Sequence, residues 1–482
     1  MNLKEKALSG VKWTTLSTVI IGILSPLFLL VQSFFFIPEE YAYISLISVF
    51  ISLFKVIEDA GISQSIIRKD ANQNQLSSLL IFNIVLSILF FLIIFIISDY
   101  FNVLFKLDEL GAYIRYVSLI ILIVGPSMIY RALLQKDMYF LIISSIEMVR
   151  VIVLVVVGTV LFIFNFGIFG FIAGHLISSF VSLVLYIYFG VKKTKFVAKL
   201  YFSFSEIKSF LSFGIYIALK NILAEVTHNI DKVIIGIFLS KEILGIYSYA
   251  KQLIEQVRVL ITTTFSRVLF SLFAKIKNNL LLLKNTYLNI SKYVGFIVLP
   301  IFIGIIISAK EFVPIIFGVE WIDTVIYFQV LSIPIMLLSL TAGISNSLLY
   351  ALGDSKTSFK IDLLSSFLYI IALFIFSKYG GISVAIVYSF YILFKVVILQ
   401  LVSLKSINTS IFKYLYDVFA KNMIPVILMI ILYLFTSYLF NADSIFSLLV
   451  SITVAAITYL FSTYIFNRNI LIDIFKTFRI NI

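Results

Sequence analysis

Long apolar segments dominate this chain and limit what it can fold into. Fourteen segments of about 20 mostly apolar residues follow one another, the length that a helix needs to cross a bilayer. They lie near 11–36, 41–57, 76–98, 112–134, 139–164, 167–190, 212–238, 243–272, 286–308, 324–350, 358–377, 381–402, 420–440 and 444–466. The chain is 61% hydrophobic and 13% charged, whereas soluble domains are nearer a quarter charged. We therefore predict an all-α integral membrane protein with about 14 transmembrane helices.

The composition also excludes several kinds of functional site. The chain has no cysteine, which rules out disulfides, thiol catalysis and thiolate metal sites. The two histidines, His175 and His228, fall in different predicted spans without ligand-like neighbours. We therefore expect no metal and no cofactor. The net charge of +13 would indicate a nucleic-acid partner in a soluble protein. In a membrane protein, basic cytoplasmic loops account for it, so no nucleic-acid partner is expected.

The loops predict the orientation of the chain. If the N-terminus is cytoplasmic, nineteen lysines and arginines fall in loops on the cytoplasmic side, and only Lys106, Lys241, Lys310 and Lys378 fall on the other. Cytoplasmic loops of membrane proteins carry an excess of such residues. An even number of spans with both termini in the cytoplasm follows. The composition fits a multi-pass membrane protein.

The longest loop separates the predicted spans into two sets. Residues 191–211 are basic and contain the apolar residues Phe204, Ile207, Phe210 and Leu211 at helical spacing. This pattern is typical of a short helix that lies in the cytoplasmic interface. We predict an N-terminal six-helix lobe over 1–190, this amphipathic linker over 191–211 and a C-terminal six-helix lobe over 212–402. Two extra helices and a cytoplasmic tail would occupy 403–482.

The two predicted lobes share a weak sequence repeat. The end of the first span, VQSFFFIPEEYAYISLIS, is similar to the end of the seventh, VIIGIFLSKEILGIYSYAKQ. Both contain an apolar segment, a charged external turn and a tyrosine-containing entry to the next span. Because both lobes would start on the cytoplasmic side, the repeat is parallel. Two such bundles around a central cavity are typical of alternating-access transporters.

Three segments resemble a known family. NIDKVIIGIFLSKEILGIYSYAKQL (229–253) and EDAGISQSIIRK (58–69) resemble signatures of polysaccharide exporters, and FSFSEIKSFLSFG resembles the linker before their seventh span. The resemblance covers essentially the whole chain. It points to the multidrug/oligosaccharidyl-lipid/polysaccharide exporter superfamily, and within it to the Wzx-type flippases for O-antigen or capsule repeat units. Lys232 departs from the family pattern, in which arginine is common.

Two predicted spans each carry a polar stripe. Each helical residue turns by about 100°. Asn221, Glu225, His228 and Lys232 therefore share one face of the seventh span. The eighth span repeats the spacing, with the residues Lys251, Glu255, Arg258 and Thr262. Lipid cannot solvate such faces, so they should turn toward protein or water.

These charges allow two interpretations. They could lock helices together, with Glu225 and Glu255 pairing with nearby cations. They could instead line a cavity that binds a pyrophosphate, because arginine and lysine both bind phosphoryl oxygens. The candidate substrate-binding residues are Arg150, Lys220, Lys232, Lys251 and Arg258. The candidates for ion coupling or structural pairing are Glu147, Glu225, Asp231 and Glu255; Glu147 and Arg150 could also form an ion pair within one helix.

The resemblance implies a flippase, which is a transporter and not an enzyme. It would move undecaprenyl-pyrophosphate-linked oligosaccharides to the outer face of the inner membrane by alternating access. Its partners would be this glycolipid and membrane lipid, with a polysaccharide polymerase and a chain-length regulator as further candidates. A lipid II-type flippase and a drug or cation exporter are the alternatives. A membrane glycan polymerase or glycosyltransferase is more remote, because such enzymes need larger external loops than this chain has.

Overall fold

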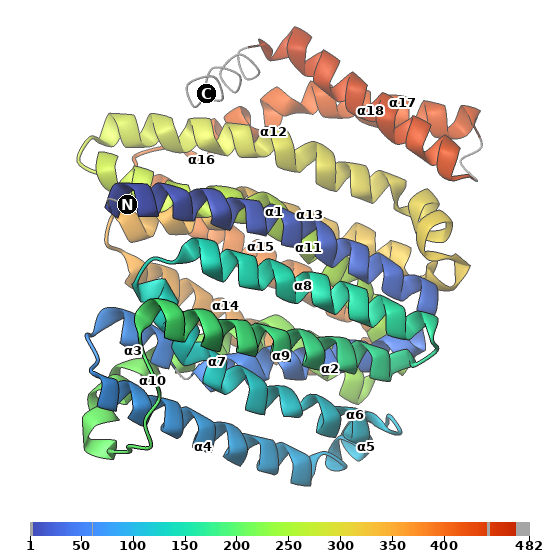
Figure 1. The fold of residues 1–482 in the computed structure, drawn as a ribbon. Coiled ribbons are helices and arrows are strands. Elements are labelled where there is room, and N and C mark those ends of the chain that lie inside the picture. Colours follow the sequence, from blue (N-terminus) through green and yellow to red (C-terminus); the bar gives the residue numbers. More distant parts are fainter. Residues whose placement is uncertain (1–2, 60, 441–443, 469–482) are drawn as a thin grey trace. The chain divides into compact units, whose positions relative to one another are not determined.

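All regular structure in the described part of the chain is helical. The computed structural model describes residues 3–59, 61–440 and 444–468 (Figure 1). Twelve helices in this part are long and apolar enough to cross a membrane, or 13 if a bent helix pair counts as one span. The all-α membrane class is therefore confirmed. The predicted cytoplasmic tail after residue 468 lies outside the described residues.

Contacts divide the chain into two compact units, Met1–Ser248 (unit 1) and Tyr249–Ile482 (unit 2). The helices of unit 1 are α1 (Leu3–Phe35), α2 (Pro38–Asp59), α3 (Ile62–Arg68), α4 (Gln73–Ile97), α5 (Tyr100–Phe105), α6 (Leu110–Val117), α7 (Leu119–Lys136), α8 (Phe140–Ile163), α9 (Gly167–Thr194), α10 (Phe204–Phe238) and the start of α11 (Lys241–Ile276). Unit 1 extends beyond residue 190 because α10 packs against α2, α3 and α4. The predicted six-helix lobes therefore remain a prediction.

Unit 2 takes the rest of α11 and the helices that follow it. These are α12 (Leu280–Phe312), η1 (Val313–Phe317), η2 (Val319–Trp321), α13 (Thr324–Ala351), α14 (Ser355–Phe376), η3 (Ser377–Tyr379), α15 (Gly381–Ser406), α16 (Ile411–Leu415), η4 (Tyr416–Ala420), α17 (Lys421–Leu439) and α18 (Ile445–Phe466). Here α13 packs against α12 and α15, and α17 runs beside α18 (Figure 1).

The observed helices differ from the predicted spans in two places. The span predicted over 112–134 consists of α6 and α7, which meet at Ser118. The span predicted over 243–272 is the single helix α11, which is not among the helices that qualify as membrane spans by composition. Its charged residues lower its mean hydropathy, so its place in a bilayer depends on what those residues contact.

The predicted interface helix exists, but protein covers its apolar face. Residues Phe204–Ser212 form the first part of α10, which bends by 53° before Ile217–Phe238. Phe204 is exposed, whereas Ile207 and Phe210 are buried. The prediction that this face lies in the membrane interface is therefore wrong for Ile207 and Phe210. Both residues lie on one face of the helix, as predicted, but they pack against neighbouring helices and not against lipid.

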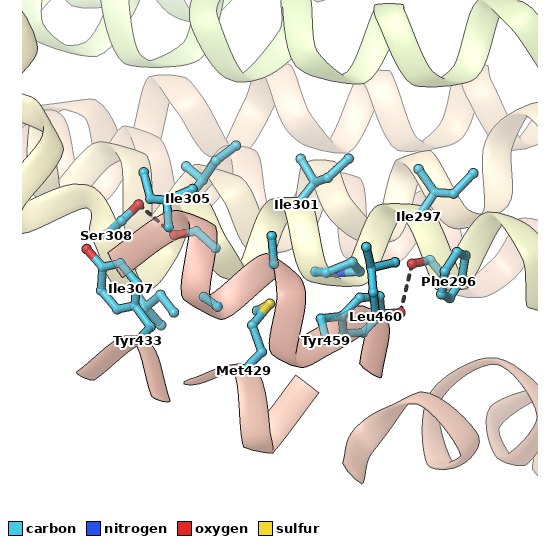
Figure 2. Close-up of a pocket in the computed structure, with 15 residues that line it drawn as sticks. Phe296, Ile297, Ile301, Ile305, Ile307, Ser308, Met429, Tyr433, Tyr459 and Leu460 are labelled. Carbon is cyan, nitrogen blue, oxygen red and sulfur yellow. Dashed lines mark hydrogen bonds between the residues drawn. The ribbon is translucent and has the colours of Figure 1, made fainter. Parts of the chain in front are cut away.

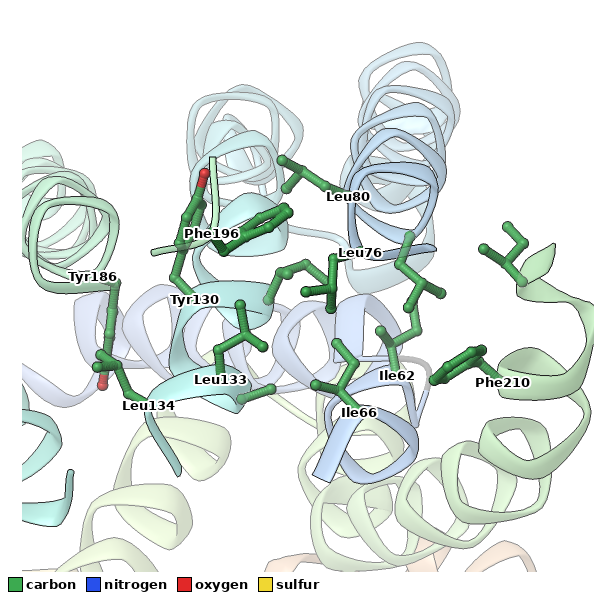
Figure 3. Close-up of a cluster of buried hydrophobic side chains, with 14 of the residues drawn as sticks. Ile62, Ile66, Leu76, Leu80, Tyr130, Leu133, Leu134, Tyr186, Phe196 and Phe210 are labelled. Carbon is green, nitrogen blue, oxygen red and sulfur yellow. The ribbon is translucent and has the colours of Figure 1, made fainter. Parts of the chain in front are cut away.

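Those two side chains belong to a core cluster that draws on six helices of unit 1. Figure 3 shows Phe210 beside Ile62 and Ile66 of α3, with Leu76 and Leu80 of α4 in the same cluster. The remaining buried members are Leu79, Ile129, Tyr130, Ala132, Leu133, Leu134, Ile146, Tyr186, Phe196 and Ile207. This cluster fixes α7, α8 and α9 against one another, and these helices carry the polar site described below.

The structure shows why the 58–69 segment has a glycine at position 61. It precedes α3 with φ of +69°, and a Cβ atom there would lie 2.1 Å from the carbonyl oxygen of Gly214 in α10. Both the left-handed backbone and the close approach of α10 therefore require glycine. Gly353 has φ of +84° but no atom within 4 Å of an added Cβ.

The pair allows backbone strain to be separated from packing. Gly61→Ala is expected to lower the free energy of unfolding by about 2–3 kcal/mol, because strain and overpacking add. Gly353→Ala should cost only about 1 kcal/mol, from backbone strain alone. Thermal unfolding in detergent would measure both. Equal losses would contradict the packing of Gly61 against α10.

Candidate functional site

Glu147 is the centre of a polar cluster in unit 1. The Arg150 Nε atom donates to its Oε2 atom at 3.1 Å, one turn along α8. The Tyr186 hydroxyl of α9 donates to Oε1 at 2.8 Å. The Arg131 Nε atom of α7 lies 3.8 Å from the same oxygen. One carboxylate thus holds two arginines and a tyrosine from three helices, and the predicted ion pair with Arg150 is present.

The cluster lines a small polar cavity. Its volume is about 200 Å³, and its walls come from α2, α7, α8 and α9. The lining residues are Lys55, Val124, Ser127, Met128, Arg131, Glu147, Arg150, Ser179, Ser182 and Tyr186. Three are cationic and one is acidic, so the cavity carries a positive formal charge. Serine hydroxyls around it can hydrogen-bond to an anion or to water.

Packing positions this cavity. Tyr186 is 3% exposed and belongs to the core cluster of Figure 3, where Figure 3 also places Leu133 and Leu134 of α7. Arg131 lies on α7 two residues before Leu133, and Glu147 follows the buried Ile146 on α8. The apolar residues therefore fix the helix faces that carry the charges.

Unit 2 contains a second cluster of the same kind. The Arg258 Nε atom lies 2.6 Å from the Glu255 Oε2 atom, one turn apart on α11. The Tyr388 hydroxyl of α15 donates to Glu255 Oε1 at 3.1 Å. The Lys251 Nζ atom lies 4.5 Å from the centre of the Tyr388 ring, within range of a cation–π contact. Lys251 is only 1% exposed.

A further ion pair belongs to the same helices of unit 2. The Lys395 Nζ atom of α15 lies 2.8 Å from the Asp362 Oδ1 atom of α14. Lys395 follows Tyr388 by seven residues on α15, so the two side chains lie on the same face of that helix. The three cations Lys251, Arg258 and Lys395 thus accompany two carboxylates, and this cluster also has an excess of positive charge.

The remaining predicted site residues lie on α10, where only Glu225 and Lys232 belong to the predicted stripe and Lys220 and Asp231 lie outside it. Glu225 accepts a hydrogen bond of 2.7 Å from the Asn229 amide. Asp231 is fully buried and accepts one of 2.5 Å from the Tyr247 hydroxyl. Lys232 is buried, whereas Lys220 is exposed. The predicted stripe is therefore incomplete as a description of α10.

An apolar pocket lies among α12, α17 and α18 of unit 2. Figure 2 shows Phe296, Ile301 and Ile305 of α12 together with Met429 of α17 and Tyr459 of α18, all of which line the pocket. Its volume is about 480 Å³, and Tyr459 donates a hydrogen bond of 2.8 Å to the Phe296 carbonyl at its edge. The lining also contains Ile297, Pro300, Gly304, Ile307, Ser308, Tyr433, Ile452, Ala455, Ala456 and Leu460. A pocket of this composition suits a hydrocarbon chain.

Sequence reasoning did not identify several members of the two clusters. Arg131 is not among the predicted site residues, yet its Nε atom lies 3.8 Å from Glu147. Lys55 is not among the predicted site residues either, yet it lines the cavity. Tyr186 and Tyr388 were not singled out, because 27 tyrosines offer no signal by type. Their shared place in the sixth and twelfth predicted spans could have drawn attention to them.

Comparisons with known proteins connect this arrangement to a family. The model of the family described as "Polysaccharide biosynthesis protein" matches residues 35–326, more than half of the chain. The lipopolysaccharide biosynthesis protein WzxC of Escherichia coli (strain K12) is 28% identical over 382 residues, 79% of this chain and 77% of that protein. The teichuronic acid biosynthesis protein TuaB of Bacillus subtilis (strain 168) is 27% identical over 397 residues, 80% of each chain.

Solved structures share the fold. The lipid II flippase MurJ, in an inward closed conformation, aligns with a TM-score of 0.73 and 19% identity over 97% of this chain and 99% of MurJ. An inward-facing multidrug resistance transporter of the MATE family aligns with a TM-score of 0.63 and 16% identity, over 82% and 94% of the two chains. The matched family model, together with this fold, establishes that the chain belongs to the polysaccharide biosynthesis protein family.

Proposed function

We propose that this protein is a flippase for lipid-linked oligosaccharides. It moves undecaprenyl-pyrophosphate-linked repeat units from the cytoplasmic to the outer face of the bacterial inner membrane, with both of its termini in the cytoplasm. Family membership supports a role in polysaccharide biosynthesis. The names of WzxC and TuaB place those relatives in the biosynthesis of lipopolysaccharide and teichuronic acid. The shared fold with a lipid II flippase supports transport over catalysis.

The excess of cations inside apolar helix bundles is the observation that carries this proposal. Ionisable residues within a membrane protein are costly and usually mark a substrate or ion pathway. Arg150 of unit 1 and Arg258 of unit 2 each use Nε on a carboxylate. A guanidinium has five N–H donors, so both retain donors for phosphoryl oxygens. Lys251 would add a point charge, and we assign Lys220 and Lys232 of α10 to the same pathway.

Transport would proceed by alternating access. The pyrophosphate and its glycan enter from the cytoplasm, bind the cationic residues and leave on the outer face. The prenyl chain stays in a hydrocarbon environment, for which the apolar pocket among α12, α17 and α18 is suited. Glu147 and Glu255 hold arginines and tyrosines in place, Asp231 holds Tyr247, and Glu225 binds the Asn229 amide. Any of these four carboxylates that exchanges a proton would couple transport to a gradient. A polysaccharide polymerase and a chain-length regulator would act on the product.

A drug or cation exporter is the alternative that the charges disfavour. Such a protein needs an acidic interior to attract cationic compounds, whereas both described clusters contain more cations than carboxylates. A lipid II-type flippase would use the same pyrophosphate chemistry, so the charges do not separate it from a repeat-unit flippase. The two kinds of flippase differ in the glycan of their substrate, so transport assays with defined glycolipids are needed to tell them apart.

Reconstitution tests the proposed function directly. Purified protein in vesicles that contain an undecaprenyl-pyrophosphate oligosaccharide is expected to expose the glycan to a glycosidase added outside. Vesicles without protein should keep about half of the glycan protected, because only one leaflet is accessible. Parallel vesicles with lipid II and assays with cationic dyes separate the alternatives. If folded, monodisperse protein leaves the protected fraction of glycan unchanged, the proposal is contradicted.

A further inference from the structure

The segment between α9 and α10 is a loop whose backbone is held by hydrogen bonds to side chains of α4. We call residues 195–203 the 195–203 loop. The Ser77 hydroxyl accepts from the Lys199 amide at 3.1 Å, and the Ser78 hydroxyl accepts from the Ser203 amide at 3.1 Å. The Gln73 side chain donates to the Lys195 carbonyl at 3.2 Å. The first turns of α4 therefore fix the path of the loop, and Figure 1 shows it in green beside the start of α4.

The loop turns most of its apolar side chains outward. Phe196 is buried in the core cluster, where Figure 3 shows it beside Tyr130. In contrast, Leu200 is fully exposed (104%), and Val197 and Phe202 are 57% and 52% exposed. Exposed apolar side chains that are gathered on one surface mark an interaction site. The loop backbone is anchored to protein, so these side chains protrude from a fixed base.

Lysines precede, interrupt and follow these exposed apolar residues along the chain. Lys192, Lys193, Lys195 and Lys199 are all exposed, and Lys208 follows in α10. Glu206 of α10 accepts a hydrogen bond of 2.8 Å from the Tyr201 hydroxyl, which raises the pKa of that hydroxyl. Apolar side chains with interleaved lysines match the boundary of an anionic bilayer, where hydrocarbon and negative headgroups meet.

The position of the loop selects lipid as the occupant. The membrane-crossing helix α9 ends at Thr194, directly before the loop, and the loop is bonded to the first turn of the membrane-crossing helix α4. On α4, Val85, Ile88 and Leu89 continue an exposed apolar surface away from that end. The loop is therefore held at the end of two membrane spans, within reach of headgroups.

We propose that the 195–203 loop is a binding surface for anionic lipid. Val197, Leu200 and Phe202 enter the headgroup region, and the surrounding lysines contact phosphate groups. An acidic protein segment would satisfy the lysines but not the protruding apolar side chains. The proposal does not depend on what the protein transports, so a failed transport assay leaves it standing.

The absence of cysteine from the sequence allows a clean test. A single Leu200→Cys variant is labelled with an environment-sensitive dye and reconstituted into vesicles of phosphatidylcholine, with or without phosphatidylglycerol. A fraction of the lipid carries a spin-label quencher near the headgroup. We expect a blue-shifted emission and strong quenching that increases with phosphatidylglycerol. Because Leu200 is fully exposed, its replacement leaves the packing intact.

Matched variants separate lipid contact from a general surface effect. Asp137→Cys places the dye on an exposed polar turn at the same end of unit 1. The neighbouring Lys136 donates to the Lys69 carbonyl, which lies just before α4. A dye at this position should show little quenching. Lys192→Gln with Lys199→Gln should weaken the preference for anionic lipid, by a factor of roughly five per lysine. Lys356→Gln with Lys360→Gln makes the same charge change on exposed lysines of α14 and should leave the preference unchanged. The proposal would be overturned if the dye at Leu200→Cys is not quenched, or if its quenching does not change with the phosphatidylglycerol content of the vesicles.

Discussion

Replacement of Glu147 by alanine is expected to lower the free energy of unfolding by about 3–5 kcal/mol. This carboxylate accepts from Arg150 at 3.1 Å and from Tyr186 at 2.8 Å, and it lies 3.8 Å from Arg131. Its side chain is 24% exposed. Without it, two arginines and Lys55 share one small cavity with no negative charge, and their mutual repulsion adds to the lost hydrogen bonds.

Thermal unfolding in detergent measures this loss. Glu147→Gln keeps the shape and one oxygen acceptor for Tyr186, so it should lie between wild type and Glu147→Ala. The double variant Glu147→Ala with Arg150→Ala should recover part of the stability, because it also removes an uncompensated charge. Asp99→Ala breaks the Arg115–Asp99 pair, in which Asp99 is 71% exposed, and should cost less than about 1 kcal/mol. If Glu147→Ala costs no more than Asp99→Ala, the cluster does not stabilise unit 1.

Loss of three cations is expected to abolish export. In cells that lack their own flippase, the triple variant Arg150→Ala, Lys251→Ala and Arg258→Ala should leave surface polysaccharide near the level of the empty host. A hydrogen bond to a charged group contributes about 1.5–3 kcal/mol, so each arginine is expected to reduce transport by roughly tenfold to a hundredfold. The measurement is surface glycan per amount of membrane-inserted protein.

The control for this experiment is another arginine of unit 1. Arg115 forms an ion pair with Asp99 at 2.7 Å and does not line the cavity. The Arg115→Ala variant should therefore export nearly as well as wild type. Lys251 is buried, and its removal could reduce the amount of folded protein. The double variant Arg150→Ala with Arg258→Ala then decides the outcome. Wild-type export by well-produced double and triple variants would contradict the assignment of these residues to the transport pathway.

The fold class followed from the sequence because membrane spans are specified by local composition. A run of about 20 apolar residues has few alternatives in a bilayer, so most spans were placed within a few residues. Burial depends instead on neighbours distant in sequence. Ile207 and Phe210 have the spacing of an interface helix, and only the packing of α10 against α3 and α4 shows that protein covers them.

The two site clusters show the same limit. The pairs Glu147–Arg150 and Glu255–Arg258 lie three residues apart, and helix geometry alone places such side chains within reach. Their tyrosine partners, Tyr186 and Tyr388, lie 39 and 133 residues away along the chain. No local pattern predicts such contacts. On α10, Asp231 lies outside the predicted stripe, and its bond to Tyr247 could not be predicted from helix spacing.

The way in which α4 holds the 195–203 loop has an evolutionary consequence. Ser77 and Ser78 bond to backbone amides of the loop, and Ser78 also donates to the Tyr201 carbonyl. The outward side chains of the loop take no part in those bonds. Relatives could therefore exchange Val197, Leu200 or the lysines freely while the path of the chain is preserved. Such a loop would adapt to membranes of different lipid content without any change in the transport machinery.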